Sequence, residues 1–233
     1  MSFASRMLDL LLPPRCAGCG ERESWLCPAC AAGLAPLGDR RCRLCAAPLG
    51  GDVTLCADCY RDPPPLERVQ AAFRHEGLAR ELVLDLKYRG HRHLAPVLGE
   101  LLAASAPRAV EGVDGLVPVP LHPQRRRERG FNQSELLAEE LGRRLRLPLV
   151  ASSLRRTRDT AQQTGLSPGE RRANVRGAFA VEGRLDGQRL LLVDDVCTTG
   201  ATLYACARAL RGAGAAAVAA AVFTRANYGV TEP

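Results

Sequence analysis

The densest group of chemically capable side chains lies in residues 189–203, which read RLLLVDDVCTTGATL. A short apolar run is followed by two carboxylates, Asp194 and Asp195, and then by a loop of small and hydroxyl-bearing residues. The alanine-rich stretch after this loop is typical of a helix. Unpaired backbone N–H groups and the positive end of the helix dipole favour an anion at a helix start. We therefore predict a phosphate site that consists of Thr198, Thr199, Gly200, Ala201 and Thr202.

Two carboxylates beside a phosphate site need an explanation, because they repel a phosphate. Ribose hydroxyl groups can donate hydrogen bonds to them, and a phosphate-bound Mg²⁺ prefers oxygen ligands. Gly200 lets the backbone approach an anion closely, and the threonine hydroxyls can add donors. The simpler alternative is a turn in which the Asp residues only cap the helix, but capping needs one such residue. Asp194 and Asp195 are therefore our candidate catalytic and ribose-binding residues.

Eight of the ten cysteines lie before residue 60, in four Cys-x-x-Cys pairs. The pairs are Cys16/Cys19, Cys27/Cys30, Cys42/Cys45 and Cys56/Cys59. Two-residue spacing lets one tight turn present two thiolates to a tetrahedral ion, so the four pairs predict two structural zinc sites, each with four cysteine ligands. Pairing consecutive turns is the simplest assignment, and a cross-braced pairing of the first turn with the third is the alternative. So small a segment has little core, and zinc would supply much of its folding energy.

The composition indicates a globular protein whose positive charge permits the binding of anionic ligands. The chain has 233 residues, of which 46% are hydrophobic, and a net charge of +7. No apolar run approaches the ~20 residues of a membrane span, and we find no cleavage site for a signal peptide. We therefore expect a cytoplasmic protein without membrane insertion, in which the thiols stay reduced. The positive charge permits binding to phosphates or nucleic acid. Lys87, the single lysine, is a candidate ligand for a pyrophosphate.

The elements that would position these residues follow from the apolar patterns. We expect strands over residues 69–74, 115–120, 147–150, 190–193 and 218–223, and helices over 77–87, 94–105, 134–145 and 203–210. This alternation predicts an α/β fold with a parallel sheet flanked by helices, and a ligand at the carboxyl ends of the strands. Three prolines at 63–65 suggest two domains, a double zinc ribbon over residues 1–62 and the α/β domain over 66–233.

Two arginine-rich segments can converge on the same edge of the sheet. One is the loop at 120–130, and the other is a long polar segment at 154–176. The basic residues of the loop are Arg125, Arg126, Arg127 and Arg129, which we take as candidates for contacts with single-stranded DNA. Solvated charge is the simpler reading. Nucleic-acid binding favours aromatic residues among the arginines, and only Tyr88, Phe131 and Trp25 are suitable.

Taken together, these motifs resemble the competence protein F (ComF) family over nearly the whole chain. The marks are the double zinc ribbon, LKYRG at 86–90, VPVPL at 117–121, RERGFNQ at 127–133 and the acidic pair with its loop. The resemblance implies a type I phosphoribosyltransferase fold that binds phosphoribosyl pyrophosphate. It also implies a link to incoming single-stranded DNA, and thus to DNA-uptake proteins, in transformable bacteria.

The resemblance also implies roles for individual residues. Asp194 and Asp195 would hold the ribose 2′- and 3′-hydroxyls, and the loop at 198–202 would cradle the 5′-phosphate. Arg125 and Arg127 lie in the segment that holds pyrophosphate in this fold, and residues 155–176 match its flexible hood. Some purine enzymes of this type carry an Asp base at the position of Thr198, which leaves the acceptor here unidentified.

Three functions therefore stay open from the sequence. The one we favour is a DNA-processing protein that binds phosphoribosyl pyrophosphate with Mg²⁺ and single-stranded DNA. The second is an active phosphoribosyltransferase that acts on an unidentified acceptor in nucleotide or related metabolism. The third is a zinc-ribbon protein whose transferase domain has lost its activity.

Overall fold

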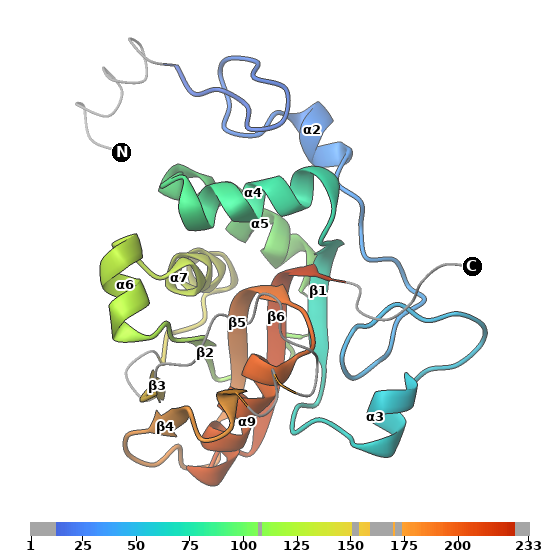
Figure 1. Cartoon of the computed structure of the whole chain (residues 1–233), viewed down its shortest axis with the longest axis vertical. Helices are drawn as coiled ribbons and strands as arrows, with labels where there is room; N and C mark the ends of the chain where they lie inside the picture. Colours follow the sequence, from blue (N-terminus) through green and yellow to red (C-terminus); the bar gives the residue numbers. More distant parts are fainter. Residues whose placement is uncertain (1–12, 107–108, 151–153, 159–169, 171–173, 227–233) are drawn as a thin grey trace.

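The computed structural model describes residues 13–106, 109–150, 154–158, 170 and 174–226. Its centre is a parallel sheet with the strand order β1-β6-β5-β2 (Figure 1). The strands are β1 (Val69–Arg74), β2 (Gly115–Pro118), β5 (Arg189–Cys197) and β6 (Ala217–Arg225). The parallel α/β sheet predicted from the sequence is thus confirmed.

Both faces of the sheet are covered, which is why its strands read as continuous apolar runs. Every residue of β6 is buried. Alternate side chains of β5 enter two cores: Leu190 and Leu192 join one, and Leu191 and Val193 join the other. The same alternation would place the side chains of Asp194 and Asp195 on opposite faces of the sheet. Contacts with neighbouring elements therefore determine where the two carboxyl groups lie.

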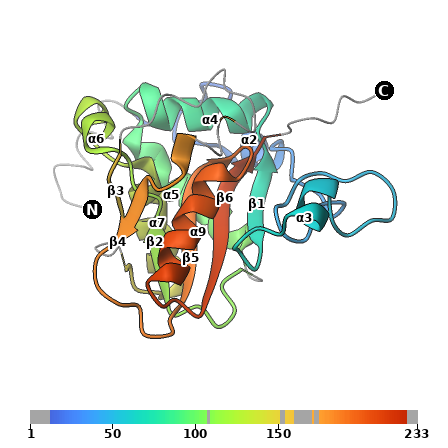
Figure 2. The ribbon, with the colours of Figure 1, turned by 60° about the horizontal axis from the view of Figure 1, so that its bottom comes forward.

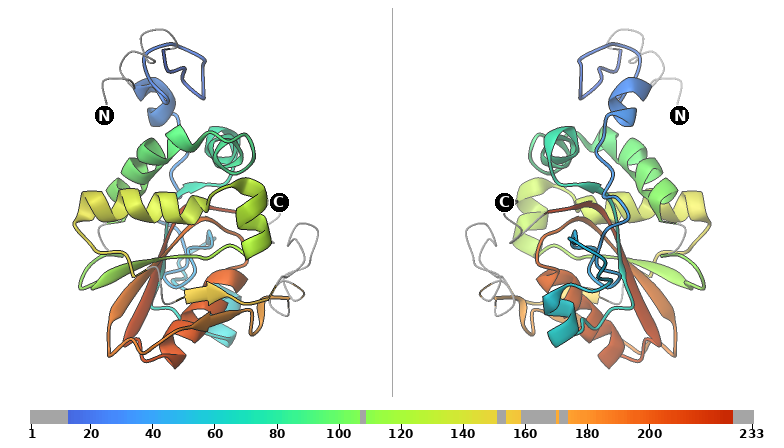
Figure 3. Two further views of the ribbon diagram at one scale, coloured as in Figure 1. Left: turned by 90° about the vertical axis from the view of Figure 1, so that its left-hand side faces the viewer. Right: turned by 90° about the vertical axis from the view of Figure 1, so that its right-hand side faces the viewer.

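The helices divide unequally between the two faces. Helices α4 (Gly77–Tyr88), α5 (Ala95–Ser105) and α7 (Gln133–Leu145) lie on one face, and α9 (Ala201–Gly212) lies on the other (Figures 2 and 3). The short helix η1 (Arg92–Leu94) leads into α5. A two-stranded antiparallel ribbon, β3 (Leu154–Arg156) with β4 (Phe179–Val181), contacts α9. No helix in the described part of the chain is both long and apolar enough to cross a membrane.

Three local expectations differ from the structure. Residues 147–150 form only an isolated parallel bridge between Leu149 and Leu116, because Pro148 has no N–H to extend a ladder. The basic loop contains a helix, α6 (Pro123–Arg129), which begins at a proline and ends at Gly130 with φ +79°. Strand β5 continues to Cys197, so the acidic pair lies within the strand and not beyond its end.

The cysteine-rich segment contacts the α/β sheet along its length. Helix α2 (Pro28–Ala32) lies near α4, and α3 (Ala57–Arg61) lies beyond the β1 edge (Figure 1). Between them the chain follows β1, where Leu37 N donates to Ala72 O (3.2 Å) and Arg74 N donates to Ala35 O (3.0 Å). The division at residue 62 therefore stays a proposal about sequence segments, and in space the two segments share both cores.

Candidate functional site

A cavity of about 650 Å³ opens where the parallel strands end. Its walls come from β5 and the start of α9, the end of α4, the loop after β2, α6 and the start of α7. It brings together nine of the candidate ligand residues that the sequence singled out: Lys87, Arg125, Arg129, Asp194, Asp195, Thr198, Gly200, Ala201 and Thr202. Thr199, Arg126 and Arg127 do not line it. The cavity thus joins the two carboxylates, the loop and part of the basic segment.

The carboxylate pair is buried and bound by two helices. Asp194 is 8% exposed and Asp195 is 2% exposed. Ser134 Oγ donates to Asp194 Oδ1 (2.8 Å), and Gln133 Nε2 donates to Asp195 Oδ1 (3.3 Å). Lys87 Nζ forms an ion pair with Asp195 Oδ2. The first turn of α7 and the last turn of α4 therefore fix both carboxyl groups.

The two carboxyl groups have different protonation chemistry. Burial, reinforced by the negative charge of Asp195, raises the pKa of Asp194 to about 8. Burial also opposes ionisation of Asp195, but the Lys87 ammonium outweighs it and lowers the pKa of Asp195. The same ion pair raises the pKa of Lys87 against the effect of burial. The pair therefore carries about one negative charge at neutral pH, and the Lys87 ammonium favours the location of that charge on Asp195.

The loop between β5 and α9, residues 198–200, turns sharply into the helix. Gly200 has φ +78° and caps α9. A Cβ at this position would stand 2.5 Å from Tyr204 Cζ, so a larger residue would both strain the backbone and displace the ring. Ala201, Thr202 and Leu203 line the cavity, which places the first turn of α9 at its wall. This arrangement supplies backbone donors for an anion.

His75 is a site residue that the sequence did not indicate. It follows β1 and lines the cavity, and its Nδ1 lies 2.9 Å from Thr224 Oγ1. Thr224 Oγ1 also lies 3.3 Å from the Asp195 carbonyl, and the tautomer with a proton on His75 Nδ1 satisfies both contacts of this hydroxyl. In that tautomer the Nε2 of the neutral ring is unprotonated. Burial and the nearby Lys87 ammonium lower the pKa of His75, which favours this neutral form.

Other missed residues are Gln133, Ser134 and Arg156. Ser134 and Gln133 follow Asn132, whose side chain accepts from Ser134 N and caps α7. A capping residue before an apolar helix is a signal in the sequence, but the contact with β5 spans 60 residues and has none. Arg156 lines the cavity from β3, inside the segment that the resemblance assigned to a hood.

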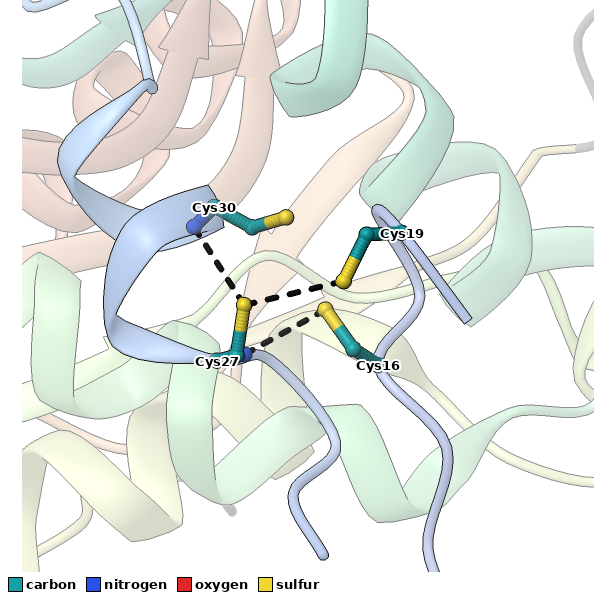
Figure 4. A group of neighbouring side chains, drawn as sticks. All are labelled: Cys16, Cys19, Cys27 and Cys30. Carbon is teal, nitrogen blue, oxygen red and sulfur yellow. Dashed lines mark hydrogen bonds between the residues drawn. The ribbon is translucent and has the colours of Figure 1, made fainter. Parts of the chain in front are cut away.

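The eight N-terminal cysteines form two groups. The first tetracysteine group is Cys16, Cys19, Cys27 and Cys30 (Figure 4), and the second is Cys42, Cys45, Cys56 and Cys59. Consecutive turns are thus grouped, in agreement with the simplest assignment. Within each group the sulfur atoms lie within 4.8 Å of one another. The Sγ atoms of Cys19 and Cys27, and of Cys45 and Cys56, are 3.7 Å apart. A tetrahedral ion with Zn–S bonds of ~2.3 Å needs about 3.8 Å, so both groups fit zinc.

Mg²⁺ would have fewer protein ligands. Among the described residues, the tetracysteine groups are the only clusters of three or more His, Cys, Asp or Glu ligand atoms. Asp194 and Asp195 supply oxygen ligands of the kind that Mg²⁺ accepts. The residues present therefore fit a Mg²⁺ ion that arrives with ligand phosphates better than one held by the protein alone.

We expect the purified protein to contain about two zinc ions for each chain. Cys16→Ser and Cys42→Ser should each remove about one ion, because each removes one ligand from a separate group. Cys206→Ser is the control, since Cys206 lies in α9 outside both groups. Metal analysis after purification under reducing conditions gives the stoichiometry. A chain without zinc, or one that loses both ions in either variant, would contradict two independent sites.

The mouth of the cavity carries basic and aromatic side chains. Tyr88 is 72% exposed, and the Arg129 guanidinium lies 5.1 Å from the centre of its ring. Arg126 forms an ion pair with Glu135, and Arg127 is exposed away from the cavity. Phe131 is buried, which removes it as a stacking residue. Tyr88 is therefore the aromatic residue at the mouth that a base could stack on.

Trp25, the third aromatic candidate, lies away from the cavity wall. Its ring packs on His93, with the ring centres 3.7 Å apart. This contact joins the first tetracysteine group to the segment after α4. Trp25 therefore has a packing role, and a nucleic-acid contact at this residue stays a prediction.

Comparisons with known proteins match two parts of the chain to known domains. Residues 7–60 match the double zinc ribbon domain, and residues 128–233 match the phosphoribosyl transferase domain. The chain is 35% identical to DNA utilization protein YhgH of Escherichia coli (strain K12), over 76% of this chain and 80% of that one. It is 29% identical to competence protein F of Haemophilus influenzae, over 74% and 79% of the two chains. It is 28% identical to competence protein ComFC of Bacillus subtilis (strain 168), over 82% and 80%.

Proposed function

Because this chain belongs to the ComF/YhgH family of DNA utilization and competence proteins, we propose that it binds phosphoribosyl pyrophosphate with Mg²⁺ and single-stranded DNA. The phosphoribosyl pyrophosphate site is the cavity at the carboxyl end of β5, and the DNA surface is its basic mouth. The relatives are named for DNA utilization and competence, so the role that we propose is in DNA uptake, together with DNA-uptake proteins. Eight clustered thiols favour the reducing cytoplasm as its location.

One observation carries the proposal for the cavity. The Asp194–Asp195 pair, the left-handed turn at Gly200 and the first turn of α9 all face the same 650 Å³ space. A ribose phosphate has hydroxyl donors at one end and an anion at the other. The carboxyl groups can accept from the 2′- and 3′-hydroxyls, while the helix start can donate to the 5′-phosphate. Both chemistries thus lie within one cavity.

The charge of the lining supports an anionic ligand. Four basic side chains line the cavity, namely Lys87, Arg125, Arg129 and Arg156, against the acidic side chains of Glu128, Asp194 and Asp195. The raised pKa of Asp194 removes one of the three negative charges at neutral pH. Arg125 and Arg129 are the candidates for the pyrophosphate. Lys87 contributes through Asp195, and Arg127 would have to reorient to take part.

Mg²⁺, when bound with the ligand, would neutralise phosphate charge and accept carboxylate oxygens. Asp195 is the ionised member of the pair and the first candidate to contact it. Asp194 can contribute once it has lost its proton. Ser134 and Gln133 each donate a hydrogen bond to one of the two carboxyl groups and so restrict their orientation.

Calorimetric titration tests the proposal directly. We expect phosphoribosyl pyrophosphate to bind in the presence of Mg²⁺, and more weakly after Mg²⁺ is chelated. Ribose 5-phosphate and pyrophosphate, tested separately, should each bind more weakly than the intact compound, because each meets only part of the site. No heat of binding with the intact compound and Mg²⁺ would rule out this function of the cavity.

The DNA surface can be tested with two matched pairs of arginines on the same short helix. Arg125 and Arg129 line the cavity mouth, whereas Arg126 and Arg127 face elsewhere. Replacing Arg125 and Arg129 with Ala should weaken the binding of a fluorescent oligonucleotide. If both contact phosphates, the slope of log K against log salt should decrease by about 1.4, or ~0.7 for each contact. Fluorescence anisotropy at several salt concentrations measures both quantities.

The Arg126→Ala/Arg127→Ala protein is the control, with the same change in charge. If this control loses more affinity for the oligonucleotide than the first variant does, the DNA surface does not lie at the mouth of the cavity. Equal binding by the wild type and both variants would exclude α6 from the DNA surface, and the cysteine-rich segment would be the next candidate.

A transferase remains the second candidate, and His75 favours it. A phosphoribosyl acceptor loses a proton when it attacks the ribose, so a transferase needs a base near the site. Thr198 supplies none, but the unprotonated Nε2 of His75 belongs to a residue that lines the same cavity. Release of pyrophosphate on addition of candidate nucleobases or amines would establish transfer. Absence of release with ligand bound would leave binding as the function.

A further inference from the structure

Arg225, the last residue of β6, joins the second tetracysteine group to the candidate ligand loop. Its Nε donates to the Cys45 carbonyl (3.0 Å), which belongs to the cysteine group. Its Nη1 donates to the Cys197 carbonyl (3.2 Å) and to the Thr198 carbonyl, where the β5–α9 loop begins. One guanidinium therefore bonds a metal-ligand residue on one side and the loop on the other.

The burial of Arg225 needs a source of negative charge. The residue is 6% exposed, and within the described part of the chain it forms no ion pair with a carboxylate. A buried cation is stable only when hydrogen bonds and an opposite charge compensate for lost hydration. Zn²⁺ held by four thiolates carries a net charge of −2. The second tetracysteine group, loaded with zinc, would supply the missing charge beside Arg225.

Tyr204 makes a second contact between the same two features. Its ring packs against the buried cysteines of the second group, Cys42, Cys45 and Cys59. The ring also occupies the space beside Gly200, where a Cβ would lie 2.5 Å from Cζ. Tyr204 belongs to the first turn of α9, and its N–H donates to the Gly200 carbonyl (2.9 Å). Displacement of the cysteine group would therefore remove packing from the start of α9.

The first tetracysteine group has no comparable contact with the loop among the described residues. It packs on the start of α4, where a Cβ at Gly18 would meet Cys30 Sγ at 2.7 Å and Leu78 Cδ2 at 3.0 Å. This contact lies at the opposite end of α4 from Lys87. The first group thus packs on α4, whereas the second contacts the β5–α9 loop. Loss of the first site is therefore an internal control for effects on the loop.

We propose that the second tetracysteine group stabilises the ligand site. In this scheme Arg225 and Tyr204 make the conformation of the β5–α9 loop depend on whether the group holds zinc. Arg225 is a positioning residue in this scheme, because it acts through the loop and does not line the cavity. The loop itself is assigned to phosphoribosyl pyrophosphate under the proposed function, on which this last step rests. Any ligand of the loop and zinc at the second group would then favour each other reciprocally.

Hydrogen exchange measures, without any ligand, how strongly the second tetracysteine group stabilises the start of α9. In Arg225→Lys, one ammonium cannot bond both the Cys45 carbonyl and the loop carbonyls. We expect the amides of residues 204–207, which make the first hydrogen bonds of α9 beginning with Tyr204 N to Gly200 O, to exchange at least tenfold faster than in the wild type. The exchange of α5 and β1 should stay unchanged, and the zinc content should stay at two. Arg211→Lys is the matched control, because Arg211 also donates to a backbone carbonyl, that of Ala216, but lies at the far end of α9.

Removal of each zinc ligand set extends the test. Cys59→Ser should accelerate exchange in the same residues of α9, whereas Cys30→Ser should not. Wild-type exchange in both Arg225→Lys and Cys59→Ser would overturn the proposal. Equal acceleration in Cys30→Ser and Cys59→Ser would also overturn it, since the effect would then be general loss of stability.

A calorimetric arm separates this inference from the proposed function. Arg225→Lys should bind phosphoribosyl pyrophosphate with Mg²⁺ at least fivefold more weakly, because the loop must be ordered on binding. If the wild type binds no such ligand, the proposed function fails, while the exchange result still decides whether the cysteine group supports the loop.

Discussion

Asp195→Asn is expected to lower the free energy of unfolding by about 3 kcal/mol, because it leaves the Lys87 ammonium without its partner. The side chains of Asp195 and Lys87 are 3% and 18% exposed, so water compensates little for the lost charge. The value lies at the lower end of the range for a broken buried pair, since Lys87 keeps some contact with solvent. For a chain of this size, the melting temperature should fall by roughly 6–12 °C.

The matched variant is Lys87→Met, which leaves Asp195 charged beside Asp194. We expect a similar loss in this protein, because two buried carboxyl groups then share one site without a cation. The double variant Asp195→Asn/Lys87→Met should recover most of the stability, since no buried charge remains from the pair. Urea unfolding of the four proteins at neutral pH gives the coupling between the two residues. Additive losses in the double variant would show that the ion pair has no net role in stability.

This expectation also separates stability from function at Lys87. The double variant retains the fold but lacks both charges, so its affinity for phosphoribosyl pyrophosphate reports on binding alone. Affinity equal to the wild type would exclude Asp195 and Lys87 from the ligand site. The single variants cannot give this answer, because they change folding and binding together.

Local sequence patterns predicted the elements, but long-range contacts determined the site. The apolar runs at 69–74, 190–193 and 218–223 marked the strands because both faces of a parallel sheet are buried. Asp194 and Asp195 stood out for the same reason, as charges directly after an apolar run. Nothing local indicated that Ser134 and Gln133 would bond them, since those contacts join residues 60 or more positions apart.

The cysteines illustrate the same limit. The Cys-x-x-Cys spacing predicted the ligand sets, because two residues between cysteines suit one tetrahedral ion. It did not indicate that the two groups would lie at different parts of the α/β sheet. That arrangement depends on residues 34–37, which follow the edge of β1, and on Arg225, which is 180 residues from Cys45.

The second large effect is a dependence of stability on pH, and it comes from the proton that the Asp194 carboxyl group keeps in the folded chain. Burial and the adjacent Asp195 raise the pKa of Asp194 to about 8 in the folded chain. In the unfolded chain its pKa is about 3.9, so between pH 4 and 8 the folded chain binds more protons at this group. Stability then decreases as pH rises through this window, by up to ~1.4 kcal/mol for each pH unit. Above pH 8 the group is ionised in both states and adds no further slope.

Asp194→Asn should remove this dependence and raise the stability at pH 8. Asn keeps an Oδ1 acceptor for Ser134 Oγ and for the N–H of Asp195, while it cannot ionise beside Asp195. Urea unfolding of both proteins at several pH values between 5 and 9 gives the difference. Shared groups such as His75, whose lowered pKa acts in the opposite sense, cancel in that comparison. A constant difference across this pH range would mean that Asp194 is ionised throughout.

The same substitution is expected to weaken phosphoribosyl pyrophosphate with Mg²⁺ at least tenfold, so that greater stability accompanies poorer binding. A cation or ribose hydroxyls at Asp194 favour its ionised form, and binding near pH 7 should therefore expel a proton from this carboxyl group. The release appears in calorimetry as a binding enthalpy that changes with the ionisation enthalpy of the buffer. In Asp194→Asn this buffer dependence should shrink to the part that comes from the ligand phosphates. Identical buffer dependence in the two proteins would show that Asp194 keeps its proton in the complex, and that Asp195 alone meets the ribose and the metal.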